Sequence, residues 1–272
     1  MIVRGGWIVA LGLVGLGGCA TGPSAALRGA GAGRPAASAG GGDAASLAAW
    51  VEGLRGTGAA ARERARALGI RVDSAGGALT ITGERAGDDA VVGAEVVLHR
   101  GPEAAVLVHT RCGNAYLLGV VHRGDGWALQ SRVALVEGGG PGTCRQTRVT
   151  GASRAMLGAV AREVVVVWES VSEEGDELPA GRIGVFSLRP GGELGALGDV
   201  EFGRVEEESG EVLEGTWEID EALSLPRDLY VQLTPSRAGA AGREVVRRTY
   251  RVQSGRLQMV EEERVPLRPR GP

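Results

Sequence analysis

The chain has 272 residues, of which 43% are apolar, 4% are aromatic and 47 are glycine. Its 30 basic side chains are all arginine and stand against 33 acidic ones, so the formal net charge is −3. This composition excludes a disordered chain and a long coiled coil, and the charge balance gives no reason to expect nucleic acid as a partner. The absence of lysine excludes Schiff-base chemistry and the phosphate-binding lysine of a P-loop.

Residues 1–18 have the build of a secretory signal peptide. A positive charge at Arg4 precedes an uncharged apolar stretch from 5 to 17, which is too short to cross a bilayer as a helix. The stretch ends in Leu16-Gly17-Gly18-Cys19. This motif resembles the lipobox of bacterial lipoproteins; the alternative is an ordinary signal peptide with an incidental cysteine.

The resemblance implies cleavage just before Cys19 and acylation of this cysteine, with palmitate as one of the chains, so that the lipid anchors the protein in a membrane. Ala20 stands where an acidic residue would retain a lipoprotein in the inner membrane. We therefore expect an outer-membrane lipoprotein that faces the periplasm or the cell surface.

Residues 19–42 are expected to form a flexible tether behind the lipidated cysteine. Gly, Ala, Ser and Pro dominate this segment, and a coil of this length has a reach of roughly 25–30 Å. A helical segment is expected over 43–70, with Asp43 as its N-cap and with Leu47, Trp50, Val51 and Leu54 on one apolar stripe. This stripe is expected to pack on a sheet, the alternative being a membrane-surface face.

From residue 71 to 272 the pattern changes to short β-branched runs separated by glycine-containing turns. The expected strands span 78–82, 95–99, 105–110, 115–122, 127–136, 147–150, 164–170, 183–188, 198–205, 212–219, 229–234, 245–253 and 257–265. No helix of crossover length separates them, so the sequence predicts a mainly β fold of antiparallel meander sheets.

A weak internal repeat divides this β-meander domain. The pattern at 94–98 recurs at 162–166 and 227–231, with acidic residues Glu95, Glu163 and Asp228 spaced 68 and 65 residues apart. Repeats near 94–150, 162–220 and 227–266 resemble the blade-like units of uncharacterised bacterial envelope lipoproteins. Three blades cannot close a propeller ring, so we expect an open stack of meander sheets or a two-layer arrangement, with the N-terminal helix covering an edge.

Two cysteines remain besides the lipidated one. In an exported chain, Cys112 and Cys144 are expected to form a disulfide, since a redox-active pair is usually spaced as Cys-x-x-Cys. Their loop of about 33 residues would contribute on the order of 3–4 kcal/mol.

The histidines His99, His109 and His122 each lie near the end of an expected strand. If the turns centre on 102–103 and 112–113, His109 lies opposite Tyr116 and shares a face with His122, while His99 lies on the other face. A three-histidine metal site is therefore disfavoured, and no cofactor is expected. The chain has no Gly-x-Ser-x-Gly or metal-ligand spacing, so an enzyme is the less favoured class.

Charge is distributed unevenly along the second half of the chain. Residues 169–221 hold 16 acidic side chains against three arginines, whereas residues 222–272 hold ten arginines against five acidic side chains. The run Glu206-Glu207-Glu208 is a candidate interaction face for a basic partner, the alternative being solvated loops and strand edges. Trp127, Trp168 and Trp217 either line a carbohydrate groove or, as we expect, pack in the core.

These observations favour a lipid-anchored cell-envelope protein that acts as a non-catalytic binding or scaffolding module, with a protein of the envelope as partner. The alternative is a cofactor-free hydrolase acting on peptidoglycan or polysaccharide, which would need a concave site uniting two acids, or an acid and a histidine.

Overall fold

The computed structural model describes residues 2–6, 41–56, 59–71, 91–110, 113–124, 126–136, 147–158, 163–170, 180–205, 212–220, 224–235 and 244–266. The elements are β1 (Ile2–Gly6), α1 (Gly41–Glu52), α2 (Ala59–Ala67), β2 (Val91–Arg100), β3 (Glu103–Thr110), β4 (Ala115–Arg123), β5 (Gly126–Val136), β6 (Thr147–Ala155), β7 (Glu163–Ser170), β8 (Ala180–Leu188), β9 (Leu194–Val205), β10 (Val212–Asp220), β11 (Asp228–Pro235), β12 (Glu244–Gln253) and β13 (Arg256–Pro266). The strand expected at 78–82 lies outside these residues.

Three four-stranded antiparallel meanders follow one another along the chain: β2–β5, β6–β9 and β10–β13. The second and third sheets are joined by a short ladder in which β9 and β10 share only the pairs Val205–Val212 and Arg204–Leu213. The prediction of a mainly β fold, built from open meander sheets behind a short N-terminal helix, is therefore confirmed.

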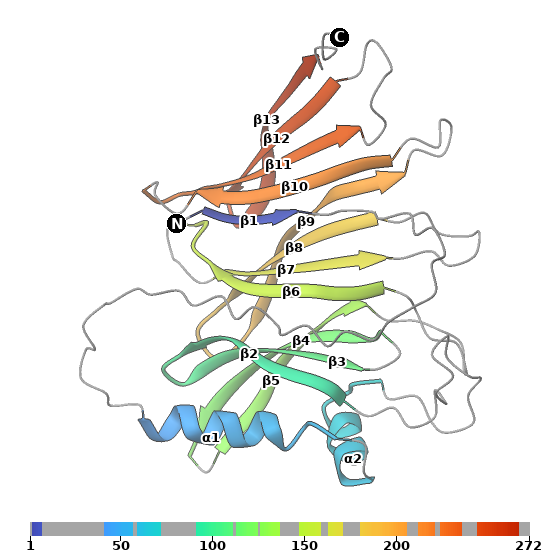
Figure 1. Ribbon diagram of the computed structural model, residues 1–272. Helices are drawn as coiled ribbons and strands as arrows, with labels where there is room; N and C mark the ends of the chain where they lie inside the picture. Colours follow the sequence, from blue (N-terminus) through green and yellow to red (C-terminus); the bar gives the residue numbers. More distant parts are fainter. Residues whose placement is uncertain are drawn as a thin grey trace, which may run out of the picture.

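The sheets are stacked with the helices at one end, as Figure 1 shows. One face of the first sheet packs on α1 and α2, where Leu47, Val51 and Leu54 are buried together with strand residues such as Val106. Their burial stabilises the contact by about 1.5–3 kcal/mol per large side chain. The indole Nε1 of Trp127 donates to the Ser46 hydroxyl at 2.9 Å and ties α1 to β5. The apolar stripe of the helix thus packs on a sheet, as expected.

The helix begins earlier than its expected cap. Because α1 starts at Gly41, Asp43 lies inside the first turn and not at the position before it.

The second sheet is buried on both faces, which explains its uninterrupted valine run. In β7, Val164 and Val166 join a core shared with the first sheet, whereas Val165 and Val167 join a core shared with the third. Successive residues of a strand point to opposite faces, so a strand covered on both sides needs apolar residues at every position.

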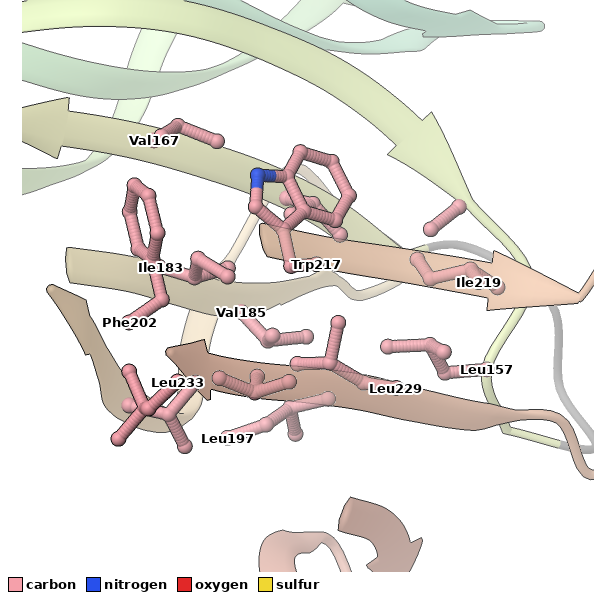
Figure 2. Packing of buried hydrophobic residues seen from close by; sticks show 14 residues of the cluster. Leu157, Val167, Ile183, Val185, Leu197, Phe202, Trp217, Ile219, Leu229 and Leu233 are labelled. Atoms are coloured by element: carbon pink, nitrogen blue, oxygen red, sulfur yellow. The ribbon is translucent and has the colours of Figure 1, made fainter. Parts of the chain in front are cut away.

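The core between the second and third sheets is the larger of these two interlayer clusters (Figure 2). It brings Ile183 and Phe202 of the second sheet against Trp217 and Leu229 of the third. All four are less than a tenth exposed.

The turn between β8 and β9 fastens the second sheet to the first. The Ser131 hydroxyl donates to Gly192 O and accepts from Leu194 N, both at 2.9 Å. The backbone N–H of Gly191 donates to Glu103 Oε1 at 3.0 Å. Gly192 has φ +83, and a Cβ added there would lie 3.0 Å from Val120 O, so glycine suits both the backbone conformation and the available space.

The phase of the repeat differs from the expected one. The sheets occupy 91–136, 147–205 and 212–266, so the second and third begin one strand before the expected repeats. Glu163 and Asp228 each open the second strand of their sheet, and the residue at this place in the first sheet is Glu103, not Glu95. The weak sequence similarity had matched a first strand with two second strands.

Candidate binding face on the third sheet

The site residues predicted from the sequence lie outside the described part of the chain. This holds for the lipidation site Cys19, for the expected disulfide between Cys112 and Cys144, and for the candidate interaction face at Glu206, Glu207 and Glu208. These assignments remain predictions.

In the part of the chain that the structure describes, no element packs on the outer face of the third sheet, whereas the first and second sheets are covered on both faces. Its inner face carries Trp217, Leu229 and Val231 into the core, while alternate residues of β10–β13 face away from the stack. Described residues on and around this outer face enclose a groove of about 760 Å3. The groove is lined by Thr216, Trp217, Glu218, Tyr230, Val231, Gln232, Arg247, Arg248, Thr249, Glu261 and Glu263.

Strand register places the polar side chains of the groove in two cross-strand rows. One row runs from Glu218 through Tyr230 and Thr249 to Glu261, and the other from Thr216 through Gln232 and Arg247 to Glu263. Arg247 Nη1 lies 3.5 Å from Glu263 Oε2, and its Nε donates to Gln232 Oε1 at 3.3 Å. The groove therefore presents hydroxyl, amide and guanidinium groups with carboxylates at its sides, which is a surface for a polar ligand and not for an apolar one.

An ion pair between the buried Asp228 and the partly exposed Arg251 lies at the end of this face. Arg251 donates from Nε to Asp228 Oδ1 at 2.6 Å and from Nη2 to Oδ2 at 2.7 Å, and Asp228 is 7% exposed. Such a bidentate pair fixes both side chains. Burial, and then the charges of Asp228 and Asp220, raise the pKa of Tyr230, so its phenol stays protonated and able to donate at neutral pH.

A second ion cluster lies on the opposite face of β12 and β13. Glu262 accepts from Arg248 Nε at 2.9 Å and from Arg264 Nη2 at 3.0 Å. The hydrogen bond from Arg248, followed by that from Arg264, lowers the pKa of Glu262 below its ordinary value near 4.5. The cluster therefore stabilises the fold above that ordinary value, and the contribution is lost as the pH falls through the lowered pKa.

We expect the variant Glu262→Gln to flatten the acid limb of the stability profile. Urea midpoints measured between about pH 6 and pH 3 should converge for wild type and variant at the acid end. A gap between the two that stays constant over this range would contradict the role of the Glu262 charge.

The histidines are arranged differently from the prediction. His109 pairs with Ala115 and not with Tyr116, so it points to the face opposite that of His122. His99 and His122 instead meet at the edge of Trp127, with ring centroids 5.6 Å and 5.3 Å from the indole. The expected grouping of His109 with His122 is wrong, because one residue of register exchanges the two faces of a strand.

A smaller cleft of about 350 Å3 contains His109. It lies between the edges of the first and second sheets and is also lined by Arg55, Glu95 and Thr150, together with Gly93, Ala94, Leu107, Val149 and Gly151. Arg55 donates from Nη2 to Ala94 O at 2.5 Å, which places its guanidinium at the rim. An acid and a histidine thus share one concavity.

Two of the three tryptophans belong to the core. Trp127 is 7% exposed and Trp217 is 9% exposed, and both pack in core clusters, as the core interpretation predicted, although Trp217 also borders the polar groove. Apart from Trp217, the groove residues on β10–β13 were not singled out from the sequence, although alternating polar residues at 216 and 218, 230 and 232, and 247 and 249 are a signal for a solvent-facing side.

No family model, curated protein or solved structure matches the chain. In the described ranges there is no cluster of three or more His, Cys, Asp or Glu side chains suited to a metal ion. Among the helices that the structure describes, none is long and apolar enough to span a membrane. Within the described residues, the chain forms a layered antiparallel β-sheet structure whose third sheet has an uncovered polar face.

Proposed function

We propose that the chain is a lipid-anchored protein of the bacterial cell envelope and that the outer face of its third sheet is a binding surface for a polar partner. The anchor is inferred from the lipobox-like motif ending in Cys19. The observation that carries the binding role is the polar groove on β10–β13, at the end of the stack away from α1 and α2.

The contents of the groove favour binding over catalysis. Glu261 and Glu263 are exposed, and Glu263 is paired with Arg247. A general acid is usually shielded from water so that its pKa is shifted toward neutrality, whereas paired, exposed carboxylates suit recognition.

Site-specific photo-cross-linking in intact cells tests this proposal. A photoreactive residue placed at Gln232, in the groove, is expected to give discrete adducts with envelope components, whereas one placed at the exposed position Arg154 on β6 gives none. The groove adducts should be lost when Cys19→Ser removes the proposed anchor, because the lipid positions the module beside its partner.

A second pair of substitutions shows whether the groove chemistry matters. Tyr230→Phe combined with Arg247→Gln should reduce adduct yield several-fold by removing donors from the groove, while Arg100→Gln on the first sheet leaves it unchanged. Equal adduct yields at Gln232 and Arg154, or yields insensitive to the groove variants, would contradict the binding role.

A second candidate function, a cofactor-free hydrolase of envelope glycans or peptides, is favoured by the cleft that unites Glu95 and His109. A histidine and a carboxylate that line one cleft are residue types that commonly carry proton transfer. The purified protein would then release product from peptidoglycan fragments, and His109→Gln would abolish this release while Glu244→Gln, on the third sheet, would not. Absence of product with wild type counts against the enzyme.

A further inference from the structure

One edge of β10 pairs with two different strands, β9 at its start and β1 further along. From Leu213 to Ile219 this strand pairs with β11 on one side, but on its other side it pairs with β9 only at Val212 and Leu213. Beyond this point β9 continues to pair with β8, so β9 and β10 diverge. Residues 216–220 of β10 therefore present an edge that β9 does not cover.

The chain itself shows what this edge accepts. Residues 2–6 form β1, which lies antiparallel against β10 with the pairs Ile2–Asp220, Val3–Ile219, Arg4–Glu218, Gly5–Trp217 and Gly6–Thr216 (Figure 1). Strand addition of this kind satisfies the backbone N–H and C=O groups of the edge, and it supplies affinity that depends little on side chains.

The occupying strand belongs to the segment that the proposed function removes. Cleavage before Cys19 takes residues 1–18 away, β1 included, and then none of the described strands pairs with this edge at 216–220, beside buried Trp217 and Ile219. An open edge next to an apolar core is a place where an extended segment binds.

We propose that residues 216–220 form a strand-acceptor site. The signal segment fills this site in the precursor, and an extended, basic segment of a partner protein fills it in the processed lipoprotein. The proposal rests on the proposed function, because only removal of the leader opens the edge. It adds a second, backbone-directed contact close to the groove, since Thr216 and Glu218 belong to both.

The register specifies the chemistry of the partner segment. Directly opposed residues in an antiparallel pair lie on the same face of the sheet, so the residue at the place of Val3 lies on the core side with Ile219. The place of Arg4 lies on the outer side opposite Glu218, and that of Gly5 opposite the bulky Trp217. We therefore infer the pattern apolar, basic, small along the incoming strand, in a region where β10 also carries Glu214 and Asp220.

A labelled synthetic peptide with the sequence of residues 1–6 serves as the probe. Its fluorescence anisotropy is measured with the processed lipoprotein, extracted in mild detergent, and with full-length Cys19→Ser, which keeps its leader. We expect saturable binding to the processed protein and at least tenfold weaker apparent affinity for the uncleaved variant. The tethered leader of that variant competes at a high effective concentration.

A charge exchange tests the register. Glu218→Arg should weaken binding of the peptide about fivefold, and the peptide carrying Arg4→Glu should recover most of the loss on this variant, because opposite charges on paired strands attract. Glu244→Arg, at the start of β12, is the matched control and should leave the affinity unchanged.

Three results would overturn the acceptor site: no binding to the processed protein even after deletion of residues 20–42, equal binding to both forms, or binding that does not change with the charge exchange. Binding that appears only after deletion of residues 20–42 would overturn the partner role, because the chain's own tether would then fill the edge. Mass measurement of the cell-extracted protein tests the proposed function separately. An unprocessed chain that keeps Met1 and lacks lipid would contradict the lipoprotein assignment. A processed, lipidated chain that does not bind the peptide would contradict only the acceptor site.

Discussion

Gly215→Ala is expected to destabilise the protein by roughly 3 kcal/mol, near the upper end of the range for a side chain forced into filled space. A Cβ at this position would lie 1.2 Å from Phe202 O and 2.3 Å from its carbonyl carbon. Both are backbone atoms and cannot turn aside as a flexible side chain does. The added methyl group must therefore push β9 and β10 apart where only two residue pairs join the second and third sheets.

The measurement is equilibrium urea unfolding followed by tryptophan fluorescence, since Trp217 lies two residues beyond the substitution. Gly151→Ala is the matched control, because Gly151 also lies in a strand but an added Cβ would have no atom within 4 Å. This control should change the free energy of unfolding by about 0.5 kcal/mol or less. Equal midpoints for the two variants would contradict the close approach of β9 and β10.

The second large effect is expected for Glu163→Ala, which should lower the free energy of unfolding by about 3 kcal/mol or more. Glu163 is 5% exposed, and its two carboxylate oxygens accept from Leu157 N and Gly158 N, each at 3.1 Å. Truncation leaves two buried backbone donors without this acceptor. It also loosens Leu157, whose carbonyl accepts from Arg227 N at 2.9 Å at the entrance to β11.

The repeat supplies the matched control for this prediction. Glu103 holds the same place at the start of the second strand of its sheet, but it accepts one backbone donor at the surface. Glu103→Ala should therefore cost about 1 kcal/mol or less. Amide hydrogen exchange gives an independent readout: Glu163→Ala should speed exchange at Arg227, and unchanged protection there would contradict the proposed link between the second and third sheets.

Much of the fold can be predicted from the pattern of apolar and polar residues over short stretches of sequence. The β-branched runs locate the described strands after residue 90, and the stripe of Leu47, Val51 and Leu54 identifies the face of α1 that packs on the first sheet. The run Val164–Val167 even implies burial on both faces, because a strand with one solvent-exposed face would alternate apolar and polar residues. Local composition is sufficient for these features, since each depends on residues close together in the chain.

Features that depend on register were not predictable in the same way. A one-residue difference in the turn after β3 pairs His109 with Ala115, and this moves the histidine to the other face. The phase of the repeat was missed for a related reason, because Glu95 and Glu103 both precede apolar runs and only pairing shows which one opens a second strand. The groove combines four strands, so no single segment of sequence displays it.

The pairing of the strand at residues 2–6 was also not predictable from the sequence. Its residues are typical of the start of a signal peptide, and nothing in five residues indicates that they pair with a strand more than two hundred positions away. Non-local pairing of this kind depends on an edge that exists only once the third sheet has formed.

The order of the layers determines how far the groove lies from the end of the molecule that would carry the proposed lipid anchor. The helices, which follow the proposed tether in the chain, cover the first sheet, and the groove lies on the far side of the third. Stacked sheets lie about 10 Å apart, so the groove stands roughly 20 Å beyond the first sheet. In the proposed lipoprotein, the number of sheets would thus set the distance from the tether end of the molecule to the groove, and the length of the tether would set the volume that the groove explores.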